Sequence, residues 1–141
     1  MKQKIIKTTD IKKNDFVLYG LVSSANDYRI AWLLNNKLNI KLKKADDFTI
    51  EIKKLSEITN YTQFSTEDNP SNIRFISNKD ANSLKLFKLD FDYILIINKD
   101  CEYVDNIKNY LSQINEIMLS SKIQILTKHN KKILEKIHKN L

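Results

Sequence analysis

Apolar and polar residues recur along this chain with two different periods, and each period predicts a type of element. Apolar residues return every three or four positions over 24–38, which is typical of an amphipathic helix. The same spacing predicts a second helix, whose apolar face is formed by Val104, Ile107, Leu111, Ile114 and Met118. Residues 130–141 repeat the pattern in a short basic helix. Strand composition marks 15–23, 48–52, 60–66, 73–77, 91–98 and 122–128.

The predicted order of elements is therefore β-α-β-β-β-β-α-β-α. Two strand-helix-strand units flank a run of strands, and this order is typical of an α+β sandwich. We expect an antiparallel or mixed sheet with the two long helices on one face and the short C-terminal helix after them. The nearest named arrangement is a ferredoxin-like split β-α-β unit with extra strands. Without an internal repeat or a linker, residues 1–141 are expected to form a single α+β domain.

A few residues give local signals for turns and helix ends. Gly20, the only glycine, predicts a bulge or a close approach within the first strand. Ser24 with Asp27 matches the pattern of a helix N-cap, and Asn39 is suited to the left-handed conformation that follows a helix. Pro70, the only proline, falls in the turn expected between the third and fourth strands. These two strands are predicted to pair as an antiparallel hairpin.

Composition then limits the functions that this fold can carry. The formal net charge is +7, but only Arg29 and Arg74 are arginine, and the other basic residues are lysine. Lysine, isoleucine and asparagine are enriched together, as AT-rich codons produce whatever the function. We therefore favour a solvated lysine surface over nucleic-acid recognition, which is best served by arginine.

No segment is predicted to enter a membrane or to direct secretion. The longest apolar run is YILII at 93–97, which is far shorter than a membrane span, and the N-terminal residues lack an apolar run of signal-peptide length. Cys101 is the only cysteine, so an internal disulfide is impossible. A cytoplasmic location is expected, with no contact with membranes.

Residues 26–48, which read NDYRIAWLLNNKLNIKLKKADDF, also carry a resemblance to a known family. Its features are an Asp-Tyr-Arg start, an aromatic residue one turn on, a helix end and an acidic pair, here Asp27-Tyr28-Arg29, Trp32, Leu38-Asn39-Ile40 and Asp46-Asp47. The stretch is similar to the opening of the small bacterial IPExxxVDY family. The naming signature falls at 85–93, where only Asp92 and Tyr93 match and the Ile-Pro-Glu portion is absent. The resemblance implies a cytoplasmic protein with one compact domain, and it implies no reaction.

The sequence contains few of the residue patterns that mark a catalytic, nucleotide-binding or metal-binding site. A chain with one glycine cannot form a glycine-rich phosphate loop, so Walker and Rossmann fingerprints are excluded. His129, His138 and Cys101 lack the spacing of zinc ligands, and we predict neither a metal nor a cofactor. The acids Asp90 and Asp92 alternate along a strand, so they share a face, and in one interpretation like charges raise the pKa of one of them. We favour the other interpretation, in which one is a turn acid and the other is a buried acid with a hydrogen bond.

The helix at 24–38 carries the side chains that are the best candidates for a binding role. Arg29 could hold a carboxylate with two hydrogen bonds, and we expect an internal partner such as Asp27, Asp46, Asp47 or Asp92. Trp32 either packs on the sheet, which we favour, or stays partly exposed as an interface anchor. Asp46 and Asp47 are expected to close the turn after the helix.

Three functional hypotheses follow. The first is a non-catalytic domain that binds a protein partner or a second copy of itself, through the first long helix and an exposed sheet edge; its candidate binding residues are Tyr28, Arg29, Trp32, Asp92 and Tyr93. The alternative is nucleic-acid binding by the C-terminal helix, through Lys128, Lys131, Lys132, Lys136 and Lys139. The third, which ranks last, is a small enzyme centred on Arg29, Asp92 and Tyr93. Whether the chain is an enzyme stays open, and we favour that it is not.

Overall fold

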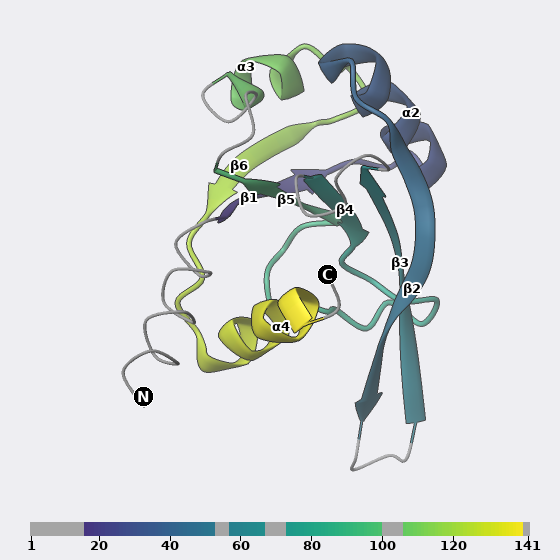
Figure 1. Cartoon of the computed structure of the whole chain (residues 1–141), viewed down its shortest axis with the longest axis vertical. Helices are drawn as coiled ribbons and strands as arrows, with labels where there is room; N and C mark the ends of the chain where they lie inside the picture. The colour runs from purple at the N-terminus through teal and green to yellow at the C-terminus, as the bar shows by residue number, and fades with distance from the viewer. Residues whose placement is uncertain (1–15, 53–56, 67–72, 100–105, 140–141) are drawn as a thin grey trace.

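The computed structural model describes residues 16–52, 57–66, 73–99 and 106–139 (Figure 1). These residues form six strands and three helices, in the predicted order β-α-β-β-β-β-α-β-α. The strands are β1 (Phe16–Val22), β2 (Leu42–Ile52), β3 (Glu57–Thr66), β4 (Ile73–Ser77), β5 (Tyr93–Asn98) and β6 (Leu119–Ile123). The helices are α2 (Asp27–Leu38), α3 (Ile107–Ser112) and α4 (Lys128–Lys139). The predicted α+β class is confirmed.

The strands form one open sheet in the order β2-β3-β4-β5-β1-β6, and every neighbouring pair is antiparallel. Of the two arrangements expected from the sequence, the sheet is therefore antiparallel rather than mixed. The predicted pairing of β3 with β4 is confirmed, whereas Pro70 lies outside the described residues. β5 and β6 run in the same direction on either side of β1. This order does not confirm a ferredoxin-like arrangement.

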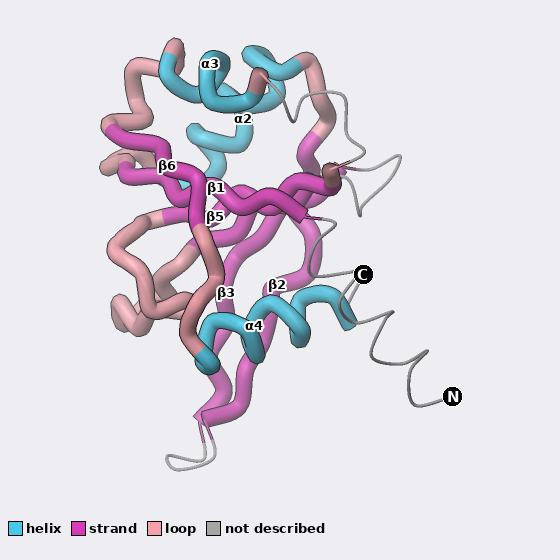
Figure 2. Tube along the Cα trace, turned by 90° about the vertical axis from the view of Figure 1, so that its left-hand side faces the viewer, coloured by secondary structure: helices cyan, strands magenta, loops and turns pink. Residues whose placement is uncertain are grey.

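Helices cover both faces of the sheet (Figure 2). One face carries α2 and α3, and its core includes Leu21, Ile30, Leu34, Phe75, Leu95, Ile107 and Leu111. The opposite face carries α4, and its core includes Leu18, Leu86, Phe87, Ile94, Ile96, Ile133, Leu134 and Ile137. The central strand β5 is buried from Tyr93 to Ile97 and contributes alternate side chains to the two cores, as its continuous apolar run predicted.

The expected pair of long helices on one face is not what the structure has. α2 and α3 do share a core, but α3 has only six residues, and the second long helix of the described residues, α4, covers the other face. Ile114 and Ile117 remain buried after the end of α3, in a turn, while Met118 is exposed. The apolar residues continue at helical spacing beyond α3 because Ile114 and Ile117 pack into the same core as the helix, although they lie in a turn.

The ends of α2 agree with the sequence at one terminus only. Asn39 follows the helix in the left-handed conformation with φ 54°, as predicted. The N-cap is Asn26 rather than Ser24, because the Asn26 side chain accepts a hydrogen bond of 2.8 Å from the Arg29 amide. The helix therefore begins at Asp27, and its first turn carries the aromatic and basic side chains that matter below.

Gly20 lies where the core on the α4 side of the sheet leaves no room for a side chain. A Cβ atom at this position would come within 2.3 Å of the Phe91 ring. The sequence predicted a bulge or a close approach of another backbone at Gly20; the structure has instead a side chain there, the ring of Phe91, which fills the space that glycine leaves. This contact holds the segment before β5 on the middle of β1.

Candidate functional site

The outer side of α2 presents an exposed pair of aromatic residues. Tyr28 is 62% exposed and Trp32 is 57% exposed. Because Ile30 and Leu34 face the core, Trp32, which lies midway between them in the sequence, points to the opposite side of the helix. The favoured expectation that Trp32 packs on the sheet is therefore wrong. We call Tyr28, Arg29 and Trp32, with their partner Glu116, the α2 surface.

Arg29 is fixed between a carboxylate and an aromatic ring. Its Nη2 atom lies 2.9 Å from Oε2 of Glu116, in the turn between α3 and β6, and its guanidinium carbon lies 5.3 Å from the centroid of the Trp32 ring. The internal carboxylate partner expected from the sequence is therefore present, but it is Glu116 and none of the four aspartates named as examples. The hydrogen bond and charge of Arg29 lower the pKa of Glu116. Nothing in the sequence pointed to Glu116, because the contact spans two separate elements.

The first turn of α2 is also anchored to β3. The Tyr28 ring meets the Phe64 ring edge-on, with 5.3 Å between the centroids. Beside it, the Thr62 hydroxyl donates a hydrogen bond of 2.7 Å to the Asp27 carboxylate. Tyr28 thus stands on a turn that β3 supports, which limits the conformational entropy that its side chain would lose on binding.

A shallow cavity of about 400 Å³ adjoins the α2 surface. It lies between α2 and the turn after α3, and its lining residues are Leu33, Asn36, Lys37, Gln113, Ile114, Asn115 and Glu116. Lys37 bridges the two sides through a hydrogen bond of 3.2 Å to the Gln113 side chain. The α2 surface therefore has two exposed aromatic side chains, Tyr28 and Trp32, with a cavity beside them.

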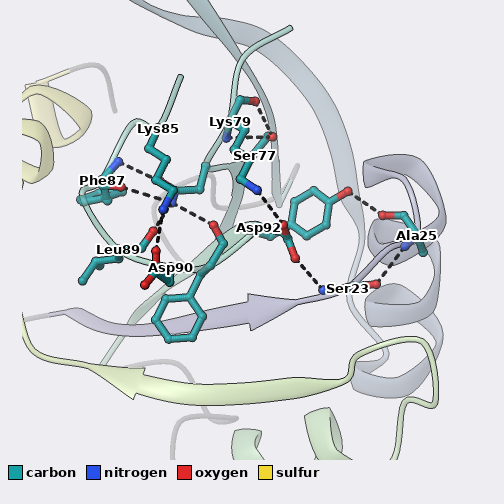
Figure 3. Close-up of polar contacts among 12 residues, drawn as sticks. Ser23, Ala25, Ser77, Lys79, Lys85, Phe87, Leu89, Asp90 and Asp92 are labelled. Carbon is teal, nitrogen blue, oxygen red and sulfur yellow. Dashed lines mark hydrogen bonds and ion pairs between the residues drawn. The ribbon is translucent and has the colours of Figure 1, made fainter. Parts of the chain in front are cut away.

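Asp92 and Tyr93 hold the segment that leads into α2; Figure 3 shows Asp92 beside Ser23. The Asp92 carboxylate accepts a hydrogen bond of 3.0 Å from the Ser23 amide and pairs with Lys79 at 3.3 Å. The Tyr93 hydroxyl donates to the Ala25 carbonyl at 2.7 Å. Burial raises the pKa of Tyr93 to about 12, with smaller contributions from the charges of Asp27 and Asp92.

These contacts separate the residues that the enzyme hypothesis brought together. The side chain of Arg29 pairs with Glu116, whereas Asp92 and Tyr93 bond to Ser23 and Ala25. The Ser23 hydroxyl donates in turn to the Glu116 carbonyl. Asp92 and Tyr93 therefore hold the segment that precedes α2. Their side chains do not meet the Arg29 side chain at a common site.

The other candidate acids have structural partners. Asp46 and Asp47 lie in β2 at a shift of register and are exposed, and Asp47 pairs with Lys44 at 2.8 Å. The expectation that these two acids close the turn after α2 is wrong. The Asn35 side chain closes it, through hydrogen bonds of 2.7 Å and 3.1 Å to the backbone of Leu42.

Asp90 and Asp92 do not act as a like-charged pair. Asp90 is exposed and bonds to Lys85 at 2.6 Å, whereas Asp92 bonds to Lys79. The hydrogen bond and charge of Lys85 lower the pKa of Asp90, which is opposite to the rise expected from a neighbouring carboxylate.

On the far side of the molecule, α4 is amphipathic as predicted. Ile133 and Ile137 are buried, and the lysines that face solvent are Lys128, Lys131, Lys132 and Lys136. Lys139 belongs to the helix, but its side chain, like that of His138 and all of Cys101, lies outside the described residues. The ring nitrogen Nε2 of His129 lies 3.0 Å from the Leu86 carbonyl, which ties the start of α4 to the loop beneath it.

The described His, Cys, Asp and Glu residues include no group of three that could hold a metal ion. No described helix has both the length and the apolar character needed to cross a bilayer.

Comparison with known proteins adds no relative. No family model matches the chain, and no curated protein is similar enough to count as a match. The resemblance to the IPExxxVDY family stays a prediction.

Proposed function

We propose that this chain acts without catalysis, by binding protein through the α2 surface. The observation that carries the proposal is the 57% exposure of Trp32, the only tryptophan, beside Tyr28 and Arg29. Tryptophan, tyrosine and arginine are the residues most enriched at the energetic centres of protein interfaces. Keeping the Trp32 ring in water forgoes the stabilisation that burial would give, and a binding partner restores it.

The arrangement around Trp32 favours binding because its side chains are already ordered. Arg29 is fixed by the Glu116 carboxylate and lies against the Trp32 ring, while Tyr28 is supported by Phe64. A partner would therefore meet side chains whose rotamers are largely set, and the entropy cost of forming the interface is reduced. The cavity beside the α2 surface offers a place for a side chain of the partner.

A second copy of the chain is the occupant that the charges favour. The α2 surface carries both Arg29 and Glu116, which are opposite in sign and adjacent. Two copies related by a twofold axis can present the Glu116 of each to the Arg29 of the other, because such an interface must be self-complementary. The Trp32 rings would then lie near the axis, where they exclude water from the ion pairs. The proposal includes a cytoplasmic location and membership of the IPExxxVDY family.

The single tryptophan makes the test direct. Sedimentation velocity over a range of concentrations would follow assembly, and the emission of Trp32 should move to shorter wavelength as the ring leaves water. Trp32→Ala should raise the dissociation constant of the dimer by about tenfold or more, as expected for a central aromatic residue. Ile58→Ala is the matched control, since Ile58 is 69% exposed on β3 and belongs to neither the α2 surface nor its cavity.

Two outcomes would contradict the proposal. A monomer at every concentration, with unchanged emission from Trp32, would exclude self-association. An equal loss of assembly in Ile58→Ala would move the interface away from α2.

The second candidate function is nucleic-acid binding by α4. It is favoured by the row of exposed lysines on this helix, Lys128, Lys131, Lys132 and Lys136. Arginine does not reinforce them, because Arg74 is buried and bonds to Gln63 and Arg29 lies in the α2 surface. Retention on heparin that falls steeply with salt and is weakened by replacing these lysines with glutamine would support this function.

A further inference from the structure

A second and larger cavity, of about 560 Å³, lies between the sheet and α4. Its lining comes from the start of β1, the end of β6 with the segment that follows, α4, and Lys99 after β5. In Figure 1, α4 lies below the edge strand β6, to which this segment connects it. The volume is within the range of roughly 300–1,000 Å³ that is typical of small-molecule sites.

The walls of the cavity are mostly apolar. Of the eleven described residues that line it, seven are apolar, namely Phe16, Val17, Leu18, Ile123, Ile125, Leu126 and Leu134. Leu18 and Leu134 are buried, at 4% and 5% exposure, and so mark its inner side. Leu126 is 74% exposed and marks the side open to water. A ligand that entered here would therefore place apolar surface inside.

The charged residues of the cavity lining, as far as the structure describes it, all have the same sign. They are Lys99, Lys122 and Lys131, and none of the described lining residues is acidic. All three are exposed, and within the described residues no carboxylate pairs with their ammonium groups. Among the described residues, the cavity therefore combines an apolar interior with lysines that no described carboxylate pairs with.

We propose that this cavity binds an amphiphilic carboxylate, specifically a straight-chain fatty acid. The alkyl chain lies against Leu18, Leu134 and the isoleucines of the β6 side, and the carboxylate lies at the side open to water, where the lysines of the lining supply positive charge. Burying the chain supplies affinity through the hydrophobic effect, while the lysines select for an anionic head. A phosphodiester backbone would use the charges but leave the apolar walls empty, so it matches the cavity less well.

This binding is independent of the α2 surface, because none of the residues that line the cavity belongs to that surface. A fatty acid and a protein partner can therefore be tested separately in one chain. Trp32→Ala should bind the fatty acid as the unaltered protein does.

The test uses octanoate, below the concentration at which it forms micelles, titrated into the full chain by calorimetry. Octan-1-ol keeps the chain without the charge, and acetate keeps the charge without the chain. Octanoate should bind at least about tenfold more tightly than either, because each control lacks one of the two contributions. Methyl NMR signals of Ile123, Ile125, Leu126 and Leu134 should shift with octanoate.

Lysine variants identify the charged groups. Replacing Lys99, Lys122 and Lys131 together with glutamine should weaken octanoate binding by about tenfold, while octan-1-ol binding stays the same. The matched control replaces Lys128, Lys132 and Lys136, which removes the same net charge from the same region outside the cavity. All six side chains are exposed, so both variants should keep the thermal stability of the parent chain.

Four results would overturn the proposal. The first is no heat of binding with octanoate, and the second is equal affinity for octan-1-ol, which would remove the role of the lysines. The third is equal affinity for acetate, which would reduce the site to a patch that attracts any anion. The fourth is an equal loss of affinity in the control variant, which would assign the effect to net charge rather than to this cavity.

Discussion

Arg29 on α2 and Glu116 in the turn before β6 are joined by a contact of 2.9 Å although 87 positions separate them in the chain. This contact orders the guanidinium that lies against Trp32. It also links the helix to a turn that Ser23 holds from the other side, through its hydrogen bond to the Glu116 carbonyl. The exposed aromatic surface is thus supported by residues from distant parts of the chain.

Replacing Glu116 with glutamine should affect binding more than folding. The pair is exposed to solvent, so thermal stability should hardly change. Arg29 would lose its fixed position beside Trp32, and self-association should weaken. Because Arg29 lowers the pKa of Glu116, the ion pair is present at neutral pH and is lost as the pH falls through that lowered value. Sedimentation of the parent chain and of Glu116→Gln, at pH 7 and in acid, measures the dissociation constant of each dimer. The same dissociation constant at pH 7 for both proteins would contradict the prediction.

Tyr93 should make stability fall in alkali. Burial raises the pKa of its hydroxyl from 10.0 to about 12. The folded protein therefore holds this proton more tightly than the unfolded chain does, so the contribution is complete below pH 10 and is lost as the pH rises to about 12. Urea unfolding between these pH values should show a smaller decline in Tyr93→Phe. The variant also lacks the hydrogen bond to Ala25, which should cost about 0.5–1.5 kcal/mol at neutral pH.

Gly20→Ala should destabilise the sheet through the Phe91 ring. The added Cβ would lie 2.3 Å from that ring, so the ring or the strand must move. Overpacking of this kind costs about 1–3 kcal/mol. In Gly20→Ala combined with Phe91→Ala, the space is free, and the loss of unfolding free energy should be smaller than the sum of the single losses. Additive losses in denaturant unfolding would show that the two residues do not clash.

Asn78 should be among the most sensitive polar residues in the described chain. Its buried amide donates hydrogen bonds to the carbonyls of Phe87, Leu89 and Phe91 and accepts one from the Phe87 amide (Figure 3). Asn78→Ala would leave these backbone groups without a partner, at a cost of about 3 kcal/mol or more. Asn78→Asp keeps the acceptor oxygen but loses the amide donors, so its free energy of unfolding should also be lower than that of the parent chain. A change in unfolding free energy below about 1 kcal/mol would contradict this account.

Much of the secondary structure could be predicted because it depends on local pattern. The bounds of β4 and the left-handed Asn39 match the sequence-based expectation, and β5 is buried on both faces as its apolar run indicated. β6 is less accurate: it begins at Leu119 rather than at 122, because its limits follow from pairing with β1 and not from its own composition. Propensity identifies a strand, whereas a neighbouring backbone decides where it begins and ends.

The candidate site could be predicted only in part. Tyr28, Arg29 and Trp32 were identified from the sequence, but the spacing of apolar residues did not decide on which side of α2 the Trp32 ring would lie. An aromatic residue beside an apolar stripe fits either the core or an interface, and only the packing of Ile30 and Leu34 excludes it from the core. Glu116 gave no signal at all, since its role depends on the turn that brings it to Arg29.

Periodicity and composition alone established the class of the chain and the order of its elements, because these depend on interactions within a few residues. The placement of helices on both faces, the partner of Arg29, the exposure of Trp32 and the lysine-lined cavity were decided by the tertiary structure. Each of them requires contacts between segments that are distant in the chain, and the order of the strands determines which segments meet.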